Sequence, residues 1–262
     1  MNQDQVKGIL LSIADAPMEF TVIFSGKKSK KVNGLYKPAA REIIIHNRNF
    51  SDDNLLLYTA IHEYAHHLHA CSLGGSLPSR SHTTEFWAIL HELLEKAEAG
   101  GVYKNVFAAS PELSALTTTI REKYLLQNGS LVKELGALLL KAGELCEAIG
   151  ARFEDYIDRA LCIPRLAAKT FIKMFEYDLN PSLGSDNMRF LAGIRNGEKR
   201  RAAEQSLLAG KSPDTVKREA IKRPAEEEPR ARLEKEKLRL ERTISSLTKR
   251  LDEVERELEN IP

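Results

Sequence analysis

The fold of this chain is decided by the apolar run Leu55-Leu56-Leu57-Tyr58-Thr59-Ala60-Ile61 and the motif His62-Glu63-Tyr64-Ala65-His66 that follows it directly. Two histidines four residues apart on an α-helix lie on the same face, so both imidazoles can reach one metal ion. Glu63 is rotated from them by about a third of a turn, where its carboxylate can reach a water at an open metal position. The motif therefore predicts a helix that binds Zn2+, with Glu63 as the general base.

The distribution of histidine favours a metal site independently of the motif. Six of the seven histidines fall between residues 62 and 91. The turn-forming sequence Leu73-Gly74-Gly75-Ser76-Leu77-Pro78-Ser79 ends the metal helix and lets the chain return, so His82 can become the third ligand. Glu85 is the alternative third ligand, or it could accept the N–H of a ligand imidazole.

The other histidines of this cluster have simpler interpretations. His67 and His69 project away from the ligand face, and we expect them to be partly exposed residues with a structural or supporting role. His91 is expected on a helix surface or in packing. A chance match is the alternative explanation for the motif itself, but the strand before it, its apolar flank and the His82 segment all agree with a metal site.

Local signals before the motif predict the order helix, small sheet, metal helix. Residues 3–15 have apolar side chains at near-helical spacing and predict a first helix. Residues 20–24 and 42–46 are rich in β-branched and aromatic side chains and predict two strands, with a turn at Asn33-Gly34 between them. Ser51-Asp52-Asp53 supplies an N-cap for the metal helix.

A second amphipathic helix follows the return loop. Its apolar face is predicted from Phe86 to Ala97, and Gly100-Gly101 ends it. The apolar helix, His62-Glu63-x-x-His66, a linker with a turn, and His82-x-x-Glu85-Phe86 at the head of the second helix together resemble the SprT-like (Spartan) zinc metallopeptidases and their small gluzincin-like relatives. The resemblance covers roughly residues 40–98.

This resemblance implies a peptidase whose ligands are His62, His66 and His82 and whose catalytic carboxylate is Glu63. In that family the third ligand lies in a His-Gly-Pro-x-Phe type segment, and this chain has Thr83-Thr84 in place of Gly-Pro. The implied chemistry is attack of zinc-activated water on a peptide carbonyl, with the proton passing through Glu63 to the leaving amine. For the oxyanion, the sequence offers Tyr103 and Tyr124 as candidates and does not choose between them.

Residues 126–223 are expected to form an all-α domain that contacts DNA. Two short amphipathic helices joined by a tight turn at Cys162-Ile163-Pro164 look like a helix-turn-helix, with residues 165–176 as the recognition helix. Residues 189–223 hold ten Lys and Arg against four acids, an excess that can attract phosphates. The part of this stretch from Phe190 to Pro213 is loosely similar to helices of partition-protein (ParB-like) DNA-binding domains. The candidate DNA contacts are Arg165, Lys169, Lys173, Lys199, Arg200 and Arg201.

The C-terminal region is predicted to be a linker followed by a coiled coil. Residues 224–232 are charged and begin with a proline-bounded segment, and residues 233–262 carry a heptad seam. Ile244, Leu251 and Leu258 occupy a positions, and Leu233, Leu240, Leu247, Val254 and Ile261 occupy d positions. Lys237 falls at an a position, which tends to limit the oligomer, so we expect a homodimer. The alternative is one long helix folded back on its own domain.

Composition limits the cellular setting. No apolar run approaches the roughly 20 residues that span a bilayer, and the first residues lack the basic start of a secretory signal. We therefore expect a cytoplasmic protein that does not contact membranes, and the expected DNA binding would place it at the nucleoid. Cys71, Cys146 and Cys162 are too few and too distant for a disulfide framework, and we interpret them as small buried hydrophobic residues.

These patterns together predict an α+β protein with four parts: a zinc metallopeptidase domain (1–125), a helix-turn-helix-like domain (126–223), a linker (224–232) and a coiled coil (233–262). The expected function is a DNA-associated zinc metallopeptidase that acts on a protein substrate. The alternative is a dimeric DNA-binding regulator or partition-like protein with a non-catalytic metal domain. A third hypothesis is a peptidase that cleaves one repressor and uses its helix-turn-helix to dock proteins.

Overall fold

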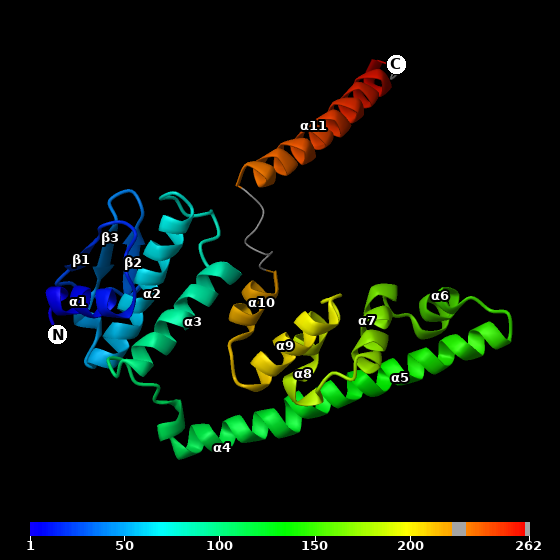
Figure 1. Cartoon of the computed structure of the whole chain (residues 1–262), viewed down its shortest axis with the longest axis horizontal. Coiled ribbons are helices and arrows are strands. Elements are labelled where there is room, and N and C mark those ends of the chain that lie inside the picture. The colour runs from blue at the N-terminus through cyan, green and yellow to red at the C-terminus, as the bar shows by residue number, and fades with distance from the viewer. Residues whose placement is uncertain (222–228, 260–262) are drawn as a thin grey trace. The chain divides into compact units, whose positions relative to one another are not determined.

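The computed structural model describes residues 1–221 and 229–259 and divides the chain into two units, Met1–Ala220 and Ile221–Pro262 (Figure 1). The described chain is mostly helical with one sheet of three short strands, so the expected combination of a small sheet with helices is confirmed. No described helix is both long and apolar enough to cross a membrane.

The N-terminal part holds the sheet. Its elements are α1 (Gln3–Ile13), β1 (Thr21–Phe24), β2 (Gly34–Lys37), β3 (Glu42–Ile45), the 3-10 turn η1 (Asn47–Asn49), α2 (Asp53–Ser72) and α3 (Thr84–Ala99). The strand order is β1-β3-β2, with β1 parallel and β2 antiparallel to β3. Ile43 pairs with Val22 on one side and with Tyr36 on the other. The strand β2 is therefore an edge strand.

Side-chain caps fix where the helices begin. Asp52 accepts a hydrogen bond from the Leu55 N–H at the start of α2, which confirms the predicted cap. Thr83 does the same for the Phe86 N–H at the start of α3. The first helix ends at Ile13, two residues before its predicted end.

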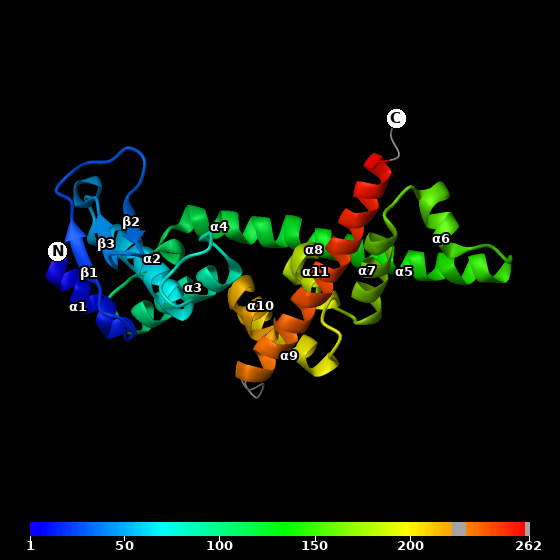
Figure 2. The same cartoon turned by 90° about the horizontal axis from the view of Figure 1, so that it is seen from above.

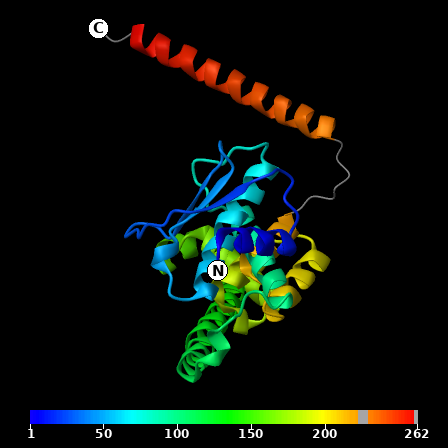
Figure 3. The ribbon, with the colours of Figure 1, turned by 90° about the vertical axis from the view of Figure 1, so that its left-hand side faces the viewer.

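One core lies between the sheet and the three helices. Figure 3 views this part from the side of α1, which packs on β1, α2 and α3. The helix α2 is buried over most of its surface, and its Tyr64 hydroxyl donates to the Ala14 carbonyl at 2.7 Å, which ties it to the end of α1. The large, fully buried side chains of this core include Leu10, Phe20, Ile43, Ile45, Ile61, Tyr64, Phe86 and Leu90.

The predicted turn at Asn33-Gly34 is wrong, because this segment begins β2. The Asn33 carbonyl accepts from the His46 N–H at 2.9 Å, so the ladder to β3 starts there. The loop before it is held by Asn49, whose side chain bonds the backbone of Ser29 and the side chain of Asn33. Gly34 is required for another reason: a Cβ there would lie 2.9 Å from Thr59 Cγ2 on α2.

The rest of the first unit is helical. Its elements are η2 (Phe107–Ala109), α4 (Pro111–Ile120), the π-helical η3 (Arg121–Leu126), α5 (Gln127–Ala148), α6 (Phe153–Asp155), the π-helical η4 (Tyr156–Leu161), α7 (Arg165–Glu176), η5 (Pro181–Leu183), α8 (Gly184–Ala192), α9 (Gly197–Leu208) and α10 (Pro213–Ile221). Figures 1 and 2 show α4, η3 and α5 as one continuous helix. This part has its own apolar clusters, one around Met174, Met188 and Leu191 and one around Leu139 and Ile157.

The second unit contains α11 (Pro229–Glu259). Its heptad residues Leu240, Ile244, Leu247 and Leu251 are exposed. The side chains of Leu233 and Leu258 and the whole of Ile261 lie outside the described residues. The homodimeric coiled coil stays a prediction.

The three cysteines differ in burial. Cys146 is buried, Cys71 is half-buried and Cys162 is exposed, so the expectation of burial is wrong for Cys162. Cys162 ends η4 in the left-handed conformation, with φ of 53°, at the turn into α7. Its position follows from that turn rather than from core packing.

Candidate metal centre

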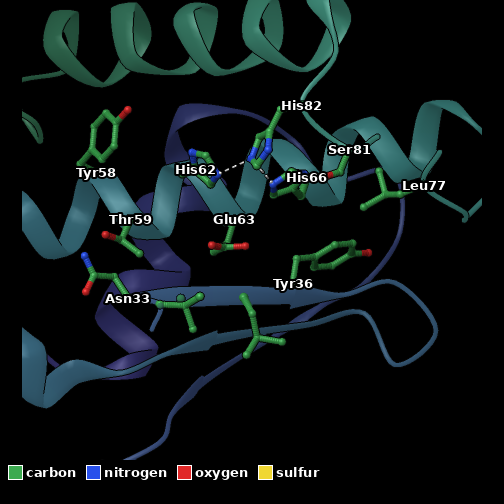
Figure 4. A pocket seen from close by; sticks show the side chains of 13 residues that line it. Asn33, Tyr36, Tyr58, Thr59, His62, Glu63, His66, Leu77, Ser81 and His82 are labelled. Carbon is green, nitrogen blue, oxygen red and sulfur yellow. Dashed lines mark hydrogen bonds between the residues drawn. The ribbon is translucent and has the colours of Figure 1, made fainter. Parts of the chain in front are cut away.

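Three imidazoles converge at the junction of α2 with the loop that precedes α3. The Nε2 atom of His82 lies 3.1 Å from Nε2 of His62 and 3.2 Å from Nε2 of His66 (Figure 4). His62 and His66 share one face of α2, and the return loop brings His82 back over them. The three histidines are close enough to bind one metal ion.

The chemistry of the three nitrogens fits a cation better than a hydrogen-bond network. A neutral imidazole nitrogen carries one proton or one lone pair, so His82 Nε2 can make only one good hydrogen bond, yet it faces two other ring nitrogens. Tetrahedral zinc with Zn–N bonds of about 2.0–2.1 Å would space its ligand atoms about 3.3 Å apart. The observed separations of 3.1 and 3.2 Å are close to that spacing.

Burial keeps two of these imidazoles neutral, which is the form that ligates metals. Burial, and then the neighbouring His82, lower the pKa of His62 to about 4. Burial, followed by His62, His82 and His69, lowers the pKa of His66 to about 3. At neutral pH both rings therefore offer lone pairs without first losing a proton.

Aromatic side chains from α3 fix the imidazoles from behind. The Phe86 ring is fully buried and stacks on His66 with centroids 4.2 Å apart, while it meets His62 and His82 edge-on. Trp87 stacks on His82 at 5.6 Å. The cap by Thr83 sets the first turn of α3 and so the direction in which Phe86 points.

Glu63 lines the same pocket as the three histidines, on the side that faces β2 (Figure 4). The pocket has a volume of about 440 Å³, and its other walls come from residues 32–36, Tyr58, Thr59, Leu77 and Ser81. Burial raises the pKa of Glu63 to about 7, and a hydrogen bond from the Tyr36 backbone partly offsets it. A cation held by the histidines would favour the carboxylate form.

The prediction that His67 and His69 are partly exposed is wrong, because both are buried. His67 Nε2 lies 3.0 Å from the Met18 carbonyl, which can only accept, so Nε2 carries the proton and Nδ1 accepts from the Tyr36 hydroxyl at 3.0 Å. His67 therefore ties the segment before β1 and the strand β2 to α2. The half-buried Cys71 lies against His67 and not against the three histidines.

Glu85 lies at the start of α3, about half exposed, and its ion-pair partner among the described residues is Arg218 at 3.6 Å. Its charge raises the pKa of His69, although burial has the larger and opposite effect. Within the described chain, the buried Nδ1 atoms of His66 and His69 have no hydrogen-bond partner. Since His82 supplies the third converging nitrogen, the alternative of Glu85 as third ligand is not favoured.

The helix α10 docks on the outer face of α3. His91 Nδ1 lies 2.5 Å from the Ser212 hydroxyl, and the Arg218 guanidinium donates to Glu92 at 3.0 Å. Arg218 is only 14% exposed, whereas its two acidic partners are about half exposed. His91 is thus a packing residue, as predicted, and its partner is the helical part of the chain.

The candidate DNA contacts fall into two groups. Lys169, Lys173, Lys199 and Arg201 are exposed and form no ion pair with a described residue. Arg165 pairs with Asp158, and the Arg200 guanidinium lies 3.5 Å from the centre of the Tyr177 ring and donates to the Ile194 carbonyl. These last two side chains already serve the local structure.

The tyrosines that line the pocket are Tyr36 and Tyr58, not the two available from sequence. Tyr103 packs against Tyr58 from outside the pocket, and Tyr124 is exposed on η3. The Tyr36 hydroxyl is engaged by His67, while the Tyr58 hydroxyl bonds no described residue. The sequence does not single out either tyrosine, because Asn33-Gly34 predicts a turn where β2 begins and Tyr58 lies within an apolar run.

No family model, curated protein or solved structure matches this chain. Its site is therefore interpreted from its own geometry.

Proposed function

We propose that this protein is a zinc-dependent metallopeptidase that associates with DNA. The observation that carries the proposal is the convergence of three imidazoles in a pocket that also holds a buried carboxylate. Three nitrogen ligands with a position left open are the pattern of catalytic rather than structural zinc sites. The motif spacing and the resemblance to SprT-like peptidases support the same chemistry.

The edge strand β2 is the expected binding surface for a substrate peptide. It lines the pocket, pairs with β3 on one side only, and within the described chain has no strand on its other side. An extended peptide can add to such an edge through main-chain hydrogen bonds. This arrangement would carry a scissile carbonyl past the three histidines.

In the proposed mechanism, His62, His66 and His82 would hold a zinc ion, which would supply Lewis-acid polarisation of the scissile carbonyl and lower the pKa of a bound water molecule. Glu63 takes the proton of the attacking water and hands it to the leaving amine. The Tyr58 hydroxyl is the donor best placed to stabilise the oxyanion, because it lines the pocket and bonds no described residue. Phe86 and Trp87 hold the ligand imidazoles in orientation.

The association with DNA rests on the exposed cations of α7 and α9. Lys169 and Lys173 extend from the predicted recognition helix, and Lys199 and Arg201 from α9. Phosphate contacts by such side chains weaken steeply with salt. The Lys169→Ala/Lys173→Ala variant should therefore lose affinity and salt dependence in a gel shift, whereas Lys96→Ala on α3 should not. Equal binding by all three proteins would refute this part.

The metal site is tested by metal content. Wild-type protein should retain about one zinc per chain by mass spectrometry and cleave casein in a manner that 1,10-phenanthroline blocks and added Zn2+ restores. His82→Ala should lose both zinc and activity, and His91→Ala, which changes a packing histidine of α3 outside the three-histidine cluster, should keep both. Zinc retained by His82→Ala would contradict the ligand assignment. Zinc without proteolysis, combined with DNA binding, would favour the DNA-binding regulator.

A further inference from the structure

The helix α5 carries an apolar stripe on the face that its own domain leaves exposed. The stripe consists of Leu131, Leu135, Leu138, Ala142, Leu145 and Ile149. The steps between these residues alternate between four and three, which is the seam of a coiled coil. The five large side chains are 37% to 79% exposed.

The other face of α5 is already packed so closely that the stripe cannot turn inward. A Cβ at Gly136 would lie 2.1 Å from the Phe171 carbonyl oxygen on α7, and one at Gly129 would lie 2.1 Å from the Pro181 carbonyl oxygen. Leu139 on this face is buried. Figure 1 shows α7 and α8 on the same side of α5. The stripe is therefore free for a partner outside this domain.

We propose that the stripe pairs in antiparallel fashion with the α5 stripe of a second copy of this chain. Glu134 and Lys141 flank the seam on one side, one heptad apart, and both are exposed and form no ion pair with a described residue. When Leu135 of one copy faces Leu138 of the other, Glu134 of each copy faces Lys141 of the second copy. The pair therefore gains two ion pairs of opposite charge.

Other arrangements lack this match. In a parallel pair, the side of α5 that carries Glu134 would face the side of the partner helix that carries Leu139. Leu139 is buried within its own domain, so it offers no charge to pair with Glu134. An antiparallel pair shifted by one heptad sets Lys141 against Lys141. The same charges therefore select both the orientation and the register of the second copy.

Charge reversal tests the pairing in the full chain. We use a background with Ile244→Glu and Leu251→Glu, so that the exposed α11 seam cannot pair, and measure association by sedimentation. Glu134→Lys or Lys141→Glu should each weaken dimerisation roughly tenfold, because two attractive pairs become repulsive, and the double reversal should restore it. Glu147→Lys, on the side of α5 away from the seam, should change nothing. A monomeric background protein, or failure of the double reversal to restore association, would overturn the proposal.

Cysteine cross-linking tests the register. In a Cys162→Ser background, Leu131→Cys and Ala142→Cys proteins are mixed, allowed to exchange subunits and oxidised. A disulfide-linked dimer should form in the mixture and in neither protein alone, because residue 131 of one copy faces residue 142 of the other. Cross-linking of Leu131→Cys with itself would show a parallel pair, and no cross-link in the mixture would show that the stripes do not meet. Either result would contradict the proposal. Because Leu131 is exposed, Leu131→Cys should fold as the wild type does, and circular dichroism of each variant checks this.

Discussion

Gly34→Ala tests how closely β2 must approach α2, the helix that carries His62, Glu63 and His66. The added Cβ would lie 2.9 Å from Thr59 Cγ2, 3.1 Å from Glu63 Cγ and 3.2 Å from Glu63 Oε1. Contacts this short require β2 and α2 to separate by a few tenths of an ångström, or Glu63 to move. Overpacking of this kind lowers the free energy of unfolding by about 1–3 kcal/mol. Alanine also restricts the unfolded chain more than glycine does, which offsets about 0.5 kcal/mol of this loss.

The same displacement moves the edge strand and Glu63 relative to the histidines. Small misplacements in an active site can cost up to about 100-fold in rate, so we expect kcat/KM for peptide hydrolysis to fall by roughly 10- to 100-fold with zinc content unchanged. Thr59→Ser removes the methyl group of the shortest contact but keeps the hydroxyl that donates to the Leu55 carbonyl. Adding Thr59→Ser to Gly34→Ala should therefore recover part of both losses.

The control for this experiment is Gly8→Ala. A Cβ at Gly8 meets nothing within 4 Å, and the residue lies within α1, so alanine there should stabilise the protein by about 1 kcal/mol and leave activity unchanged. Urea unfolding and a fluorogenic peptide assay measure both effects. Full stability and activity in Gly34→Ala would refute the argument that β2 needs glycine to approach α2, and absence of any rescue by Thr59→Ser would show that the contact with Thr59 is not the cause.

Three further changes probe the site and its support. Tyr58→Phe should lower kcat by about 10- to 100-fold with little change in KM if its hydroxyl stabilises the oxyanion, and unchanged kcat would exclude that role. In metal-free protein the pKa is lowered from 6.5 to about 4 for His62 and to about 3 for His66, so between pH 4 and 6.5 the unfolded chain binds more protons at these histidines than the folded chain does. The free energy of unfolding should therefore rise over this pH range. The pKa of Glu63, raised to about 7, has the opposite effect, but it is one group and the two histidines outweigh it. Urea unfolding at pH 5 and 6.5 measures this change, and a flat or falling profile would contradict it. Arg218→Met should cost about 1 kcal/mol by breaking the pairing of α10 with α3, and no loss of thermal stability would show that this contact contributes nothing.

The sequence predicted the elements whose signals are local. The helix α2 has a capping aspartate, a long apolar run and a motif with fixed spacing, so its start and the face that carries His62 and His66 follow from the chain itself. The third histidine could be predicted because the return loop is marked by glycine and proline. The position of α7 followed from Pro164, which precedes the helix, and from its own apolar spacing.

What the sequence did not predict depends on contacts between distant segments. Gly34 and Tyr36 lie in a short strand without β-branched residues, and the strand exists because β3 and α2 lie on either side of it. His67 looked exposed because helical spacing separates it from the ligand face, but Tyr36 and Met18 enclose it. The docking of Arg218 on α3 joins residues more than 120 positions apart, and no local pattern signals such a contact.

Glu63→Gln, assayed for zinc content and peptide hydrolysis in the same preparation, tests the central claim most directly. Glutamine keeps the shape of the side chain but cannot take a proton from water. The variant should retain about one zinc per chain and lose hydrolysis by several orders of magnitude. Hydrolysis at the wild-type rate by zinc-loaded Glu63→Gln would contradict the assignment of Glu63 as the base and, with it, the proposed peptidase mechanism.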